Sequence, residues 1–233
     1  MEMLRIQRVR TIDGARPLSW HDRPALARRQ ALIFSICAIV AIALAVPFDA
    51  MIARAMHALG IGPYLHSSQQ LRDIVIAPGW YPFTLLVAAI VAFLHRDGLK
   101  ASMFLLLTTA SAASNEVFKW GVGRIRPFKL EGAGERLAPF EFQPLRLAYV
   151  KNLCFPSGHT TLAFATAAAL GMLFPRLRPL WYAVASVVAI ERVAETAHWL
   201  SDVVAGAALG IAGAYVVAWL LKTWKIDLLT SRS

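Results

Sequence analysis

The chain has 233 residues, of which 58% are hydrophobic and 16% charged, and its mean hydropathy is +0.54. This composition excludes an ordinary soluble domain and predicts an all-α, polytopic membrane protein. The net charge of +10 does not indicate a nucleic-acid partner, because the arginines lie around apolar runs instead of forming a basic face interleaved with aromatic residues. Anionic lipid headgroups explain the positive charge better, so the predicted partner is the bilayer.

Six apolar runs follow one another along the chain and predict a bundle of six transmembrane helices. A basic cytoplasmic segment, residues 1–30 with seven arginines, precedes the first run. The membrane domain is expected over residues 31–221, and a basic cytoplasmic tail over residues 222–233. The six runs are residues 31–48, 79–94, 101–118, 159–174, 180–190 and 202–221.

Three stretches need a separate interpretation. The first run contains Ala43-Leu44-Ala45, which resembles a signal-peptide cleavage site, but the long charged lead and the later runs favour a retained anchor. Residues 49–78 contain glycine, proline and polar residues and predict a loop, or a short amphipathic helix at the interface. The run at 180–190 is too short to cross about 30 Å of hydrocarbon alone, so neighbouring helices are expected to shield its ends.

Residues 119–158 form the long connection between the third and fourth runs, with four prolines and mixed charges. A loop of this length inside a compact fold is usually functional or disordered, and this one carries part of the candidate site. Cys154 lies in this loop and Cys37 in the first run, without the partner spacing of a disulfide framework or a zinc site. We therefore expect no bridge between them, no metal and no cofactor.

The distribution of lysine and arginine predicts the orientation in the membrane. Fourteen of the 24 lie in the two terminal segments and in the connections after the second and fourth runs, and ten lie on the other side. The positive-inside rule therefore places both termini in the cytoplasm. In a bacterium this is the cytoplasmic (inner) membrane, and the connections after the third and fifth runs then lie at its outer, periplasmic face.

Three separated motifs place cations, histidines and a helix start where apolar runs meet polar segments. Fixed cations, a turn that opens a helix and two histidines are the groups that phosphoryl transfer without a metal requires. On the predicted topology all three motifs reach the outer face, so they can share one site. The motifs are Lys119 with Arg126-Pro127, Pro156-Ser157-Gly158-His159, and Arg192 with His198 and Asp202.

Together these motifs resemble the three-part signature of the type 2 phosphatidic acid phosphatase superfamily. The patterns are Lys-x6-Arg-Pro at 119–127, Pro-Ser-Gly-His at 156–159 and Arg-x5-His-x3-Asp at 192–202. The resemblance extends from about the second half of the third run to the sixth run and fits a six-span membrane fold. The family pattern usually has a serine immediately before the arginine of the third motif, where this chain has Glu191. This departure puts one hydrogen bond to the phosphate in question.

The resemblance implies a role for each motif residue. His198 would be the nucleophile that forms a phosphohistidine, and Asp202, one helical turn on, would accept the proton of its other ring nitrogen. His159 would protonate the departing alkoxide and then help to activate water. The implied phosphate-binding groups are Lys119, Arg126, Arg192, Ser157 and the backbone amides of Gly158 and His159.

The sequence thus predicts an integral-membrane, metal-independent lipid phosphate phosphatase that hydrolyses a phosphomonoester or a diphosphate. Phosphatidic acid, phosphatidylglycerol phosphate, a polyprenyl diphosphate and the phosphates of lipid A are all open as substrates. Two alternatives stay open: a phosphotransferase with the same intermediate, and a non-catalytic protein that binds or transports anionic lipids. No nucleic acid and no obligate protein partner is expected.

Single members of these motifs also have structural explanations. One intramembrane charge is more often part of a structural pair than a catalyst, but that does not explain Lys119, Arg126 and Arg192 on one face. Glu116, one turn before Lys119, is expected to be its ion-pair or packing partner. The tryptophans expected to anchor the chain at the membrane boundary are Trp80, Trp120 and Trp199.

Overall fold

The computed structural model describes residues 24–61, 64, 67–95, 97–127 and 153–224, with residues 24–27 described by their backbone alone. Contacts divide the chain into two compact units, Met1–Cys37 and Ala38–Ser233. The described part of the first unit is the beginning of helix α1, and the candidate site belongs to the second. The predicted basic segment up to residue 23, the loop over residues 128–152 and the tail from residue 225 lie outside the described residues.

Helices form the described ranges, which contain no strand, and this confirms the all-α prediction. A single antiparallel bridge joins Ile125 to Leu153. The α-helices are α1 (Pro24–Ala45), α2 (Asp49–Ala58), α4 (Gln69–Ile76), α5 (Tyr81–Leu94), α6 (Gly98–Ala110), α7 (Asn115–Val122), α9 (Gly158–Leu173), α10 (Arg178–Ala194) and α11 (Leu200–Thr223). The 3-10 helices between them are η2 (Val46–Phe48), η3 (Ala77–Gly79), η4 (Ser111–Ser114) and η6 (Pro175–Leu177).

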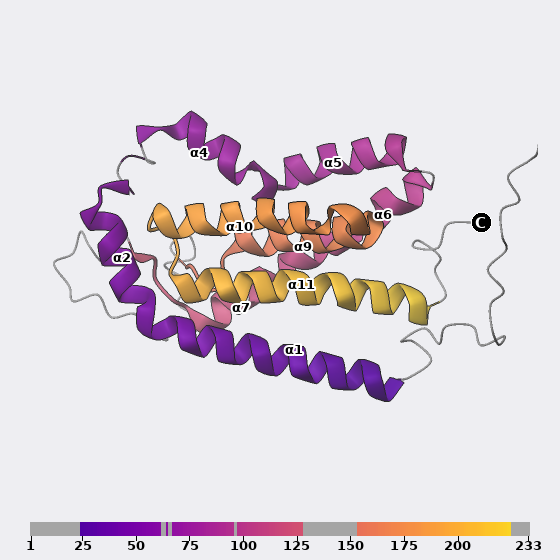
Figure 1. Cartoon of the computed structure of the whole chain (residues 1–233), viewed down its shortest axis with the longest axis horizontal. Helices are drawn as coiled ribbons and strands as arrows, with labels where there is room; N and C mark the ends of the chain where they lie inside the picture. Colours follow the sequence, from indigo (N-terminus) through magenta and orange to yellow (C-terminus); the bar gives the residue numbers. More distant parts are fainter. Residues whose placement is uncertain (1–23, 62–63, 65–66, 96, 128–152, 225–233) are drawn as a thin grey trace, which may run out of the picture. The chain divides into compact units, whose positions relative to one another are not determined.

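Helix α9 is the central element of the second unit, where it packs against α10, α11 and α6 (Figure 1). It is rich in alanine and largely buried, and small side chains let neighbouring helices approach closely. One close approach is at Gly206 of α11, where a Cβ atom would lie 2.7 Å from the carbonyl oxygen of Ser157. This contact brings the turn before α9 against the beginning of α11, where two of the three motifs meet.

One buried apolar cluster of the second unit lies between α5, α6, α9 and α11. Phe104 and Leu105 of α6 are fully buried there. Other large apolar side chains point outward, such as Phe93 at 89% exposure, which suits a lipid surround. The buried residues of this cluster are Ala88, Val91, Ala101, Phe104, Leu105, Ala169, Leu170 and Leu221.

The third predicted run is not one continuous helix. Helix α6 ends at Ala110, and η4 separates it from α7. In η4 the hydroxyl of Ser111 donates to the carbonyl of Thr108 at 2.6 Å, and that of Ser114 donates to the carbonyl of Ser111 at 2.8 Å. Serine hydroxyls that bond to the preceding turn compete with the regular helical pattern, which accounts for the break.

In the segment 49–78, predicted as a loop or a short amphipathic helix, the described residues include α2, α4 and the beginning of η3. The first helical segment continues beyond the predicted run, so that residues 28–58 form one apolar stretch long enough to cross a membrane. Helix α4 and η3 lead into α5 through a bend of 57°. The predicted loop is therefore largely helical.

Membrane-protein character is clear from the helices, but the count of six spans stays a prediction. Within the described residues, Arg28–Ala58 and Leu200–Thr223 are long and apolar enough to span a bilayer, and the bent pair Gln69–Gly79 with Tyr81–Leu94 makes up to three. Helices α9 and α10, with 16 and 17 residues, coincide with predicted runs but are short for about 30 Å of hydrocarbon.

Candidate active site

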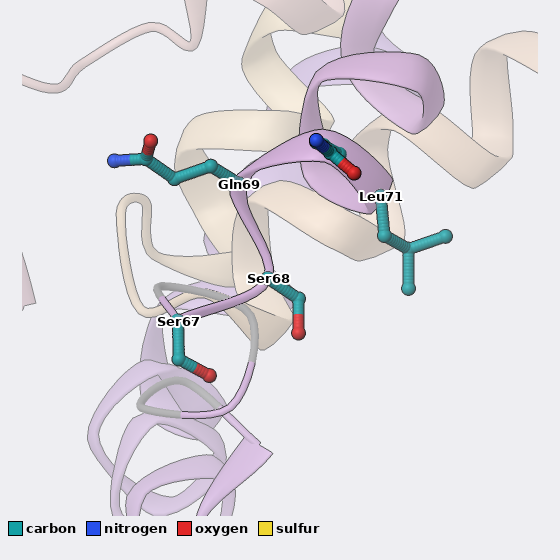
Figure 2. A pocket seen from close by; sticks show the side chains of 5 residues that line it. Ser67, Ser68, Gln69 and Leu71 are labelled. Carbon is teal, nitrogen blue, oxygen red and sulfur yellow. The ribbon is translucent and has the colours of Figure 1, made fainter.

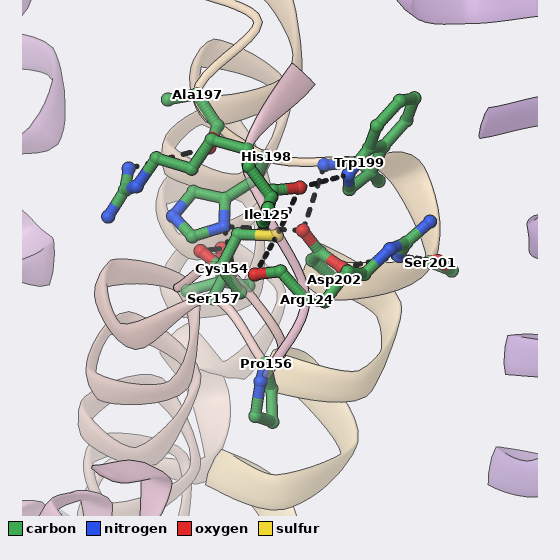
Figure 3. A network of polar contacts seen from close by, with 12 residues as sticks. Arg124, Ile125, Cys154, Pro156, Ser157, Ala197, His198, Trp199, Ser201 and Asp202 are labelled. Carbon is green, nitrogen blue, oxygen red and sulfur yellow. Dashed lines mark hydrogen bonds and ion pairs between the residues drawn. The ribbon is translucent and has the colours of Figure 1, made fainter. Parts of the chain in front are cut away.

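The three predicted motifs come together at the beginning of α9, and Figure 3 shows Pro156 and Ser157 of the second motif next to His198 and Asp202 of the third. The backbone amide of Ser157 donates to the carbonyl of Asp202 at 3.0 Å, and Arg126 Nη1 donates to the carbonyl of Ala197 at 3.4 Å. The charged or titratable groups close enough to interact electrostatically with His159 are Arg192, His198, Arg126 and Lys119. Residues from all three motifs therefore face one another.

His198 lies in the turn between α10 and α11 and is 2% exposed. Its Nδ1 is 3.0 Å from the carbonyl oxygen of Cys154, and because a carbonyl can only accept, Nδ1 carries the proton. Burial lowers the pKa of His198 from its usual 6.5 to about 4. At neutral pH the imidazole is thus uncharged, and Nε2 carries a lone pair suited to nucleophilic attack.

Asp202 is the third residue of α11, and its carboxylate lies 3.5 Å from His198 Nδ1. Its shorter contacts are with Arg124, at 2.6 Å, and with the backbone amide of Trp199, at 3.0 Å. The carbonyl of Cys154 is therefore the nearer acceptor of the His198 proton. Asp202 supplies negative charge beside that ring and also caps the first turn of α11.

His159 lies in the first turn of α9 and is half-buried. Its Nε2 is 2.9 Å from Trp80 Nε1. An indole N–H can only donate, so Nε2 accepts and the ring proton of neutral His159 is on Nδ1. Trp80, predicted as a membrane anchor, thus also holds a residue of the candidate site.

Two of the three predicted phosphate-binding cations are paired with carboxylates. Lys119 Nζ lies 2.6 Å from Glu116, which confirms the predicted partnership. Arg192 is held by Glu191 through Nε at 2.5 Å and Nη2 at 2.7 Å, and Nη2 also lies 2.6 Å from Glu195. The carboxylate that replaces the usual serine therefore contacts the guanidinium of the third motif.

The turn before α9 supplies the remaining predicted groups. Ser157 is fully buried, and its hydroxyl accepts a hydrogen bond from Thr160 at 3.0 Å. Gly158 begins α9, and a Cβ atom there would lie 3.6 Å from Lys119 Nζ. First-turn amides have no acceptor within their own helix, so those of Gly158 and His159 are suited to bind an anion next to Lys119.

A surface pocket lies at the start of α4 (Figure 2). Its lining is the consecutive segment Ser67, Ser68, Gln69, Gln70 and Leu71. None of the predicted site residues lines it. The described ranges also hold no group of three or more histidine, cysteine, aspartate or glutamate side chains placed to bind a metal ion.

The family model described as the PAP2 superfamily matches residues 100–226. The chain belongs to the PAP2 superfamily. The matched region contains all three motifs, in agreement with the resemblance found in the sequence. The crystal structure of a transmembrane PAP2-type phosphatidylglycerolphosphate phosphatase from Bacillus subtilis has a similar fold, with a TM-score of 0.53, 24% identity, and coverage of 82% of this chain and 94% of that one.

Curated relatives share the PAP2 region. The lipid A 1-phosphatase of Rhizobium etli is 34% identical over 117 residues, which are 50% of this chain and 48% of that protein. The lipid A 1-phosphatase of Porphyromonas gingivalis is 39% identical over 96 residues, 39% of this chain and 21% of that protein. The matched region thus spans at most about half the length of these relatives.

Sequence reasoning missed Arg124 and assigned the wrong role to Trp199, two side chains next to the PAP2 motif residues. Arg124 follows Gly123, which ends α7 in the left-handed region with φ of 67°, and this turn directs the chain toward α11. Arg124 is 1% exposed and bonds to Asp202 and to Asp49 of α2. Trp199, predicted as a membrane anchor, is also 1% exposed, so that prediction was wrong. Its indole lies under Arg124, whose Cζ is 4.9 Å from the ring centroid.

Proposed function

We propose that the chain is a metal-independent lipid phosphate phosphatase that acts through a phosphohistidine on His198. The observation that carries the proposal is the state of this side chain. His198 is buried and neutral, its Nδ1 proton is bound to the Cys154 carbonyl, and Nε2 carries the lone pair. Arg126 and Arg192 lie near enough to act on it electrostatically, as a nucleophile for an anionic phosphate ester needs.

The proposed reaction has two displacement steps. Nε2 of His198 attacks phosphorus, and the bond from phosphorus to the lipid oxygen breaks. His159, protonated when the anionic phosphate ester binds beside it, gives that oxygen a proton and becomes neutral. Water then attacks phosphorus, His159 takes its proton, and the bond from nitrogen to phosphorus breaks to release inorganic phosphate. Lys119, Arg126, Arg192, Ser157 and the first amides of α9 bind the phosphoryl oxygens, and Asp202 stabilises the charge on the His198 ring.

The proposed substrate class is the phosphorylated lipid A headgroup. This choice is supported by relatives at 34% and 39% identity that are lipid A 1-phosphatases. Phosphatidic acid, phosphatidylglycerol phosphate and a polyprenyl diphosphate are the competing substrates. We propose hydrolysis at the outer face of a bacterial cytoplasmic membrane, with both termini in the cytoplasm, because the positive charges are more numerous in the terminal segments and adjoining connections.

Phosphate release from this lipid panel in detergent micelles, with a chelator present, tests the proposal. We expect wild type to release phosphate, and His198→Ala to lose at least about a thousandfold in rate. His57→Ala, which removes an exposed histidine of α2, is the matched control and should retain full activity. Transfer of the phosphoryl group to a second lipid or alcohol would establish the phosphotransferase. Binding without turnover by wild type would overturn the enzyme in favour of a lipid-binding protein.

A further inference from the structure

Four polar side chains from three separate segments form a closed buried cluster beside His198: Asp49, Arg124, Ser201 and Asp202, here called the arginine cage. Figure 3 shows three of them, Arg124, Ser201 and Asp202. Arg124 Nη2 donates to Asp49 at 2.7 Å, and Nη1 donates to Asp202 at 2.6 Å. The side chains of Asp49, Arg124 and Asp202 are at most 1% exposed. Asp49 and Arg124 lie outside the residues assigned to the proposed reaction.

Ser201 closes the cage from the first turn of α11. Its backbone amide donates to Asp49 at 2.8 Å, and its hydroxyl donates to the same carboxylate at 2.6 Å. The hydroxyl oxygen also accepts from Arg124 at 2.7 Å. Each contact has the short length of a charge-assisted hydrogen bond. The cage therefore fixes the start of α11, and with it the position of Asp202.

Trp199 connects the cage to the turn that carries His198. Its ring lies 4.9 Å from Arg124 Cζ, within the range of a cation–π contact, and its indole donates to the carbonyl of Ile125 at 2.9 Å. Its own amide donates to Asp202 at 3.0 Å. Displacing Arg124 would thus move Trp199, which follows His198 in the sequence, and Asp202, which lies beside its ring.

The charges in the cage do not cancel. Two carboxylates face one guanidinium, which leaves one negative charge buried next to the His198 ring. Asp202 and Arg124 alone would be neutral, so Asp49 provides the excess charge. When Nε2 attacks phosphorus, the imidazole ring becomes positive, and the excess negative charge favours that state.

We propose that Asp49 and Arg124 are positioning residues that act through Asp202, holding it beside His198 and setting the negative charge that stabilises the ring during phosphoryl transfer. This inference rests on the proposed function for its kinetic consequences. The expected effect of the cage on the protonation of His198 does not depend on the proposed function, because it holds whether or not the chain hydrolyses a lipid phosphate.

The charged and titratable groups facing His198 come from several elements: Asp202 from α11, Arg192 from α10, His159 from α9 and Arg126 from the segment after α7. Arg124 bonds directly to Asp202, and Asp49 bonds to Arg124, so changes at the two cage residues reach His198 through Asp202. Asp49→Asn keeps the shape of the side chain but removes its charge, so the cage becomes neutral. Arg124→Gln makes the cage more negative, and the double variant restores a single negative charge.

The first measurement is the turnover of lipid phosphate by the full chain in micelles. Asp49→Asn should lower kcat by about tenfold, which corresponds to about 1.4 kcal/mol, and leave KM within about threefold because the phosphate-binding cations are unchanged. The double variant should recover most of the kcat that Asp49→Asn loses. Asp97→Asn, in the turn before α6, is the matched control and should retain wild-type kcat. Losses that add or worsen in the double variant would overturn the charge argument.

The second measurement is the titration of His198 by NMR of histidine-labelled protein, which requires no turnover. Removing the Asp49 charge should lower the His198 pKa, removing the Arg124 charge should raise it, and the double variant should return it toward wild type. If the His198 pKa shifts in opposite directions in the two variants but no phosphate is released, the role of the cage is supported and the phosphatase function is refuted. Phosphate release with an unmoved His198 titration would refute the cage alone. If Arg124→Gln does not fold, the kcat and the His198 pKa of Asp49→Asn test the proposal: a wild-type kcat together with an unmoved pKa would overturn it.

Discussion

Replacing Glu191 should strengthen phosphate binding, because its carboxylate occupies the guanidinium that the phosphate needs. Glu191 engages Arg192 through Nε and Nη2, at 2.5 and 2.7 Å. Glu195 adds a contact to Nη2 at 2.6 Å and is in turn paired with Arg72 at 3.1 Å. A phosphate that approaches Arg192 therefore meets a negative charge already bound there.

The magnitude follows from burial and distance. The side chains of Glu191 and Arg192 are 6% and 7% exposed, so water screens their charges weakly. Two unit charges about 6 Å apart at an effective dielectric constant of about 20 repel by roughly 3 kcal/mol. Glu191→Gln removes this repulsion, while Glu195 still orients Arg192. We expect the inhibition constant of inorganic phosphate to fall by about 10- to 100-fold.

Competitive inhibition of lipid phosphate hydrolysis by inorganic phosphate measures this effect, and direct titration calorimetry with phosphate gives an independent value. Glu191→Ser, which restores the residue usual in the family signature, should behave like Glu191→Gln. Glu116→Gln is the comparison variant, because Glu116 also pairs with a site cation but is 53% exposed. Its effect should stay within about threefold. Weaker phosphate binding in both Glu191 variants would show that Glu191 orients Arg192 for the substrate, contrary to this reasoning.

Two further predictions concern the histidines. Trp80→Phe keeps an aromatic ring but removes the N–H that donates to His159, so kcat should fall by about three- to tenfold, the value of one hydrogen bond; an unchanged rate would show that the bond is incidental. Burial lowers the pKa of His198 from 6.5 to about 4, so the unfolded chain takes up this proton first as pH falls. The free energy of unfolding should then drop by up to about 3 kcal/mol between pH 6.5 and pH 4. Unfolding curves of wild type and His198→Gln in detergent measure it, and equal drops in the two proteins would contradict it.

The predicted site could be found from sequence because its chemistry lies in the identity of side chains within short motifs. Lys119, His159 and His198 each lie where an apolar run meets a polar segment. Because successive spans cross the membrane in opposite directions, these ends are expected at the same face. The helical class was equally accessible, since runs of this hydropathy are helical in a membrane. Exact helix ends were not accessible: Ser111 and Ser114 break the third run by local hydrogen bonds that composition does not predict.

The arginine cage lay beyond the sequence for a different reason. Asp49 and Arg124 are 75 residues apart, and each has an ordinary explanation when taken alone. Asp49 marks the end of the first run, and Arg124 counts as one of the positive charges on the outer side. The sequence offered one indication of the role of Arg124: it lies two residues before Arg126 and directly after Gly123, where a glycine can turn the chain. The acceptor of the His198 proton had no signal, because it is the backbone carbonyl of Cys154.

Carboxylates around the predicted phosphate-binding cations explain how a strongly positive site can exist before substrate arrives. Lys119 with Glu116, and Arg192 with Glu191 and Glu195, form ion pairs that offset the mutual repulsion of the cations. A phosphate then binds by replacing these carboxylates as the partner of the cations, so the net free energy of phosphate binding in the ground state is small. Charge on the phosphoryl oxygens redistributes in the transition state, where cations held in place contribute most. Weak ground-state binding combined with fixed cations therefore favours turnover over tight retention of the released phosphate.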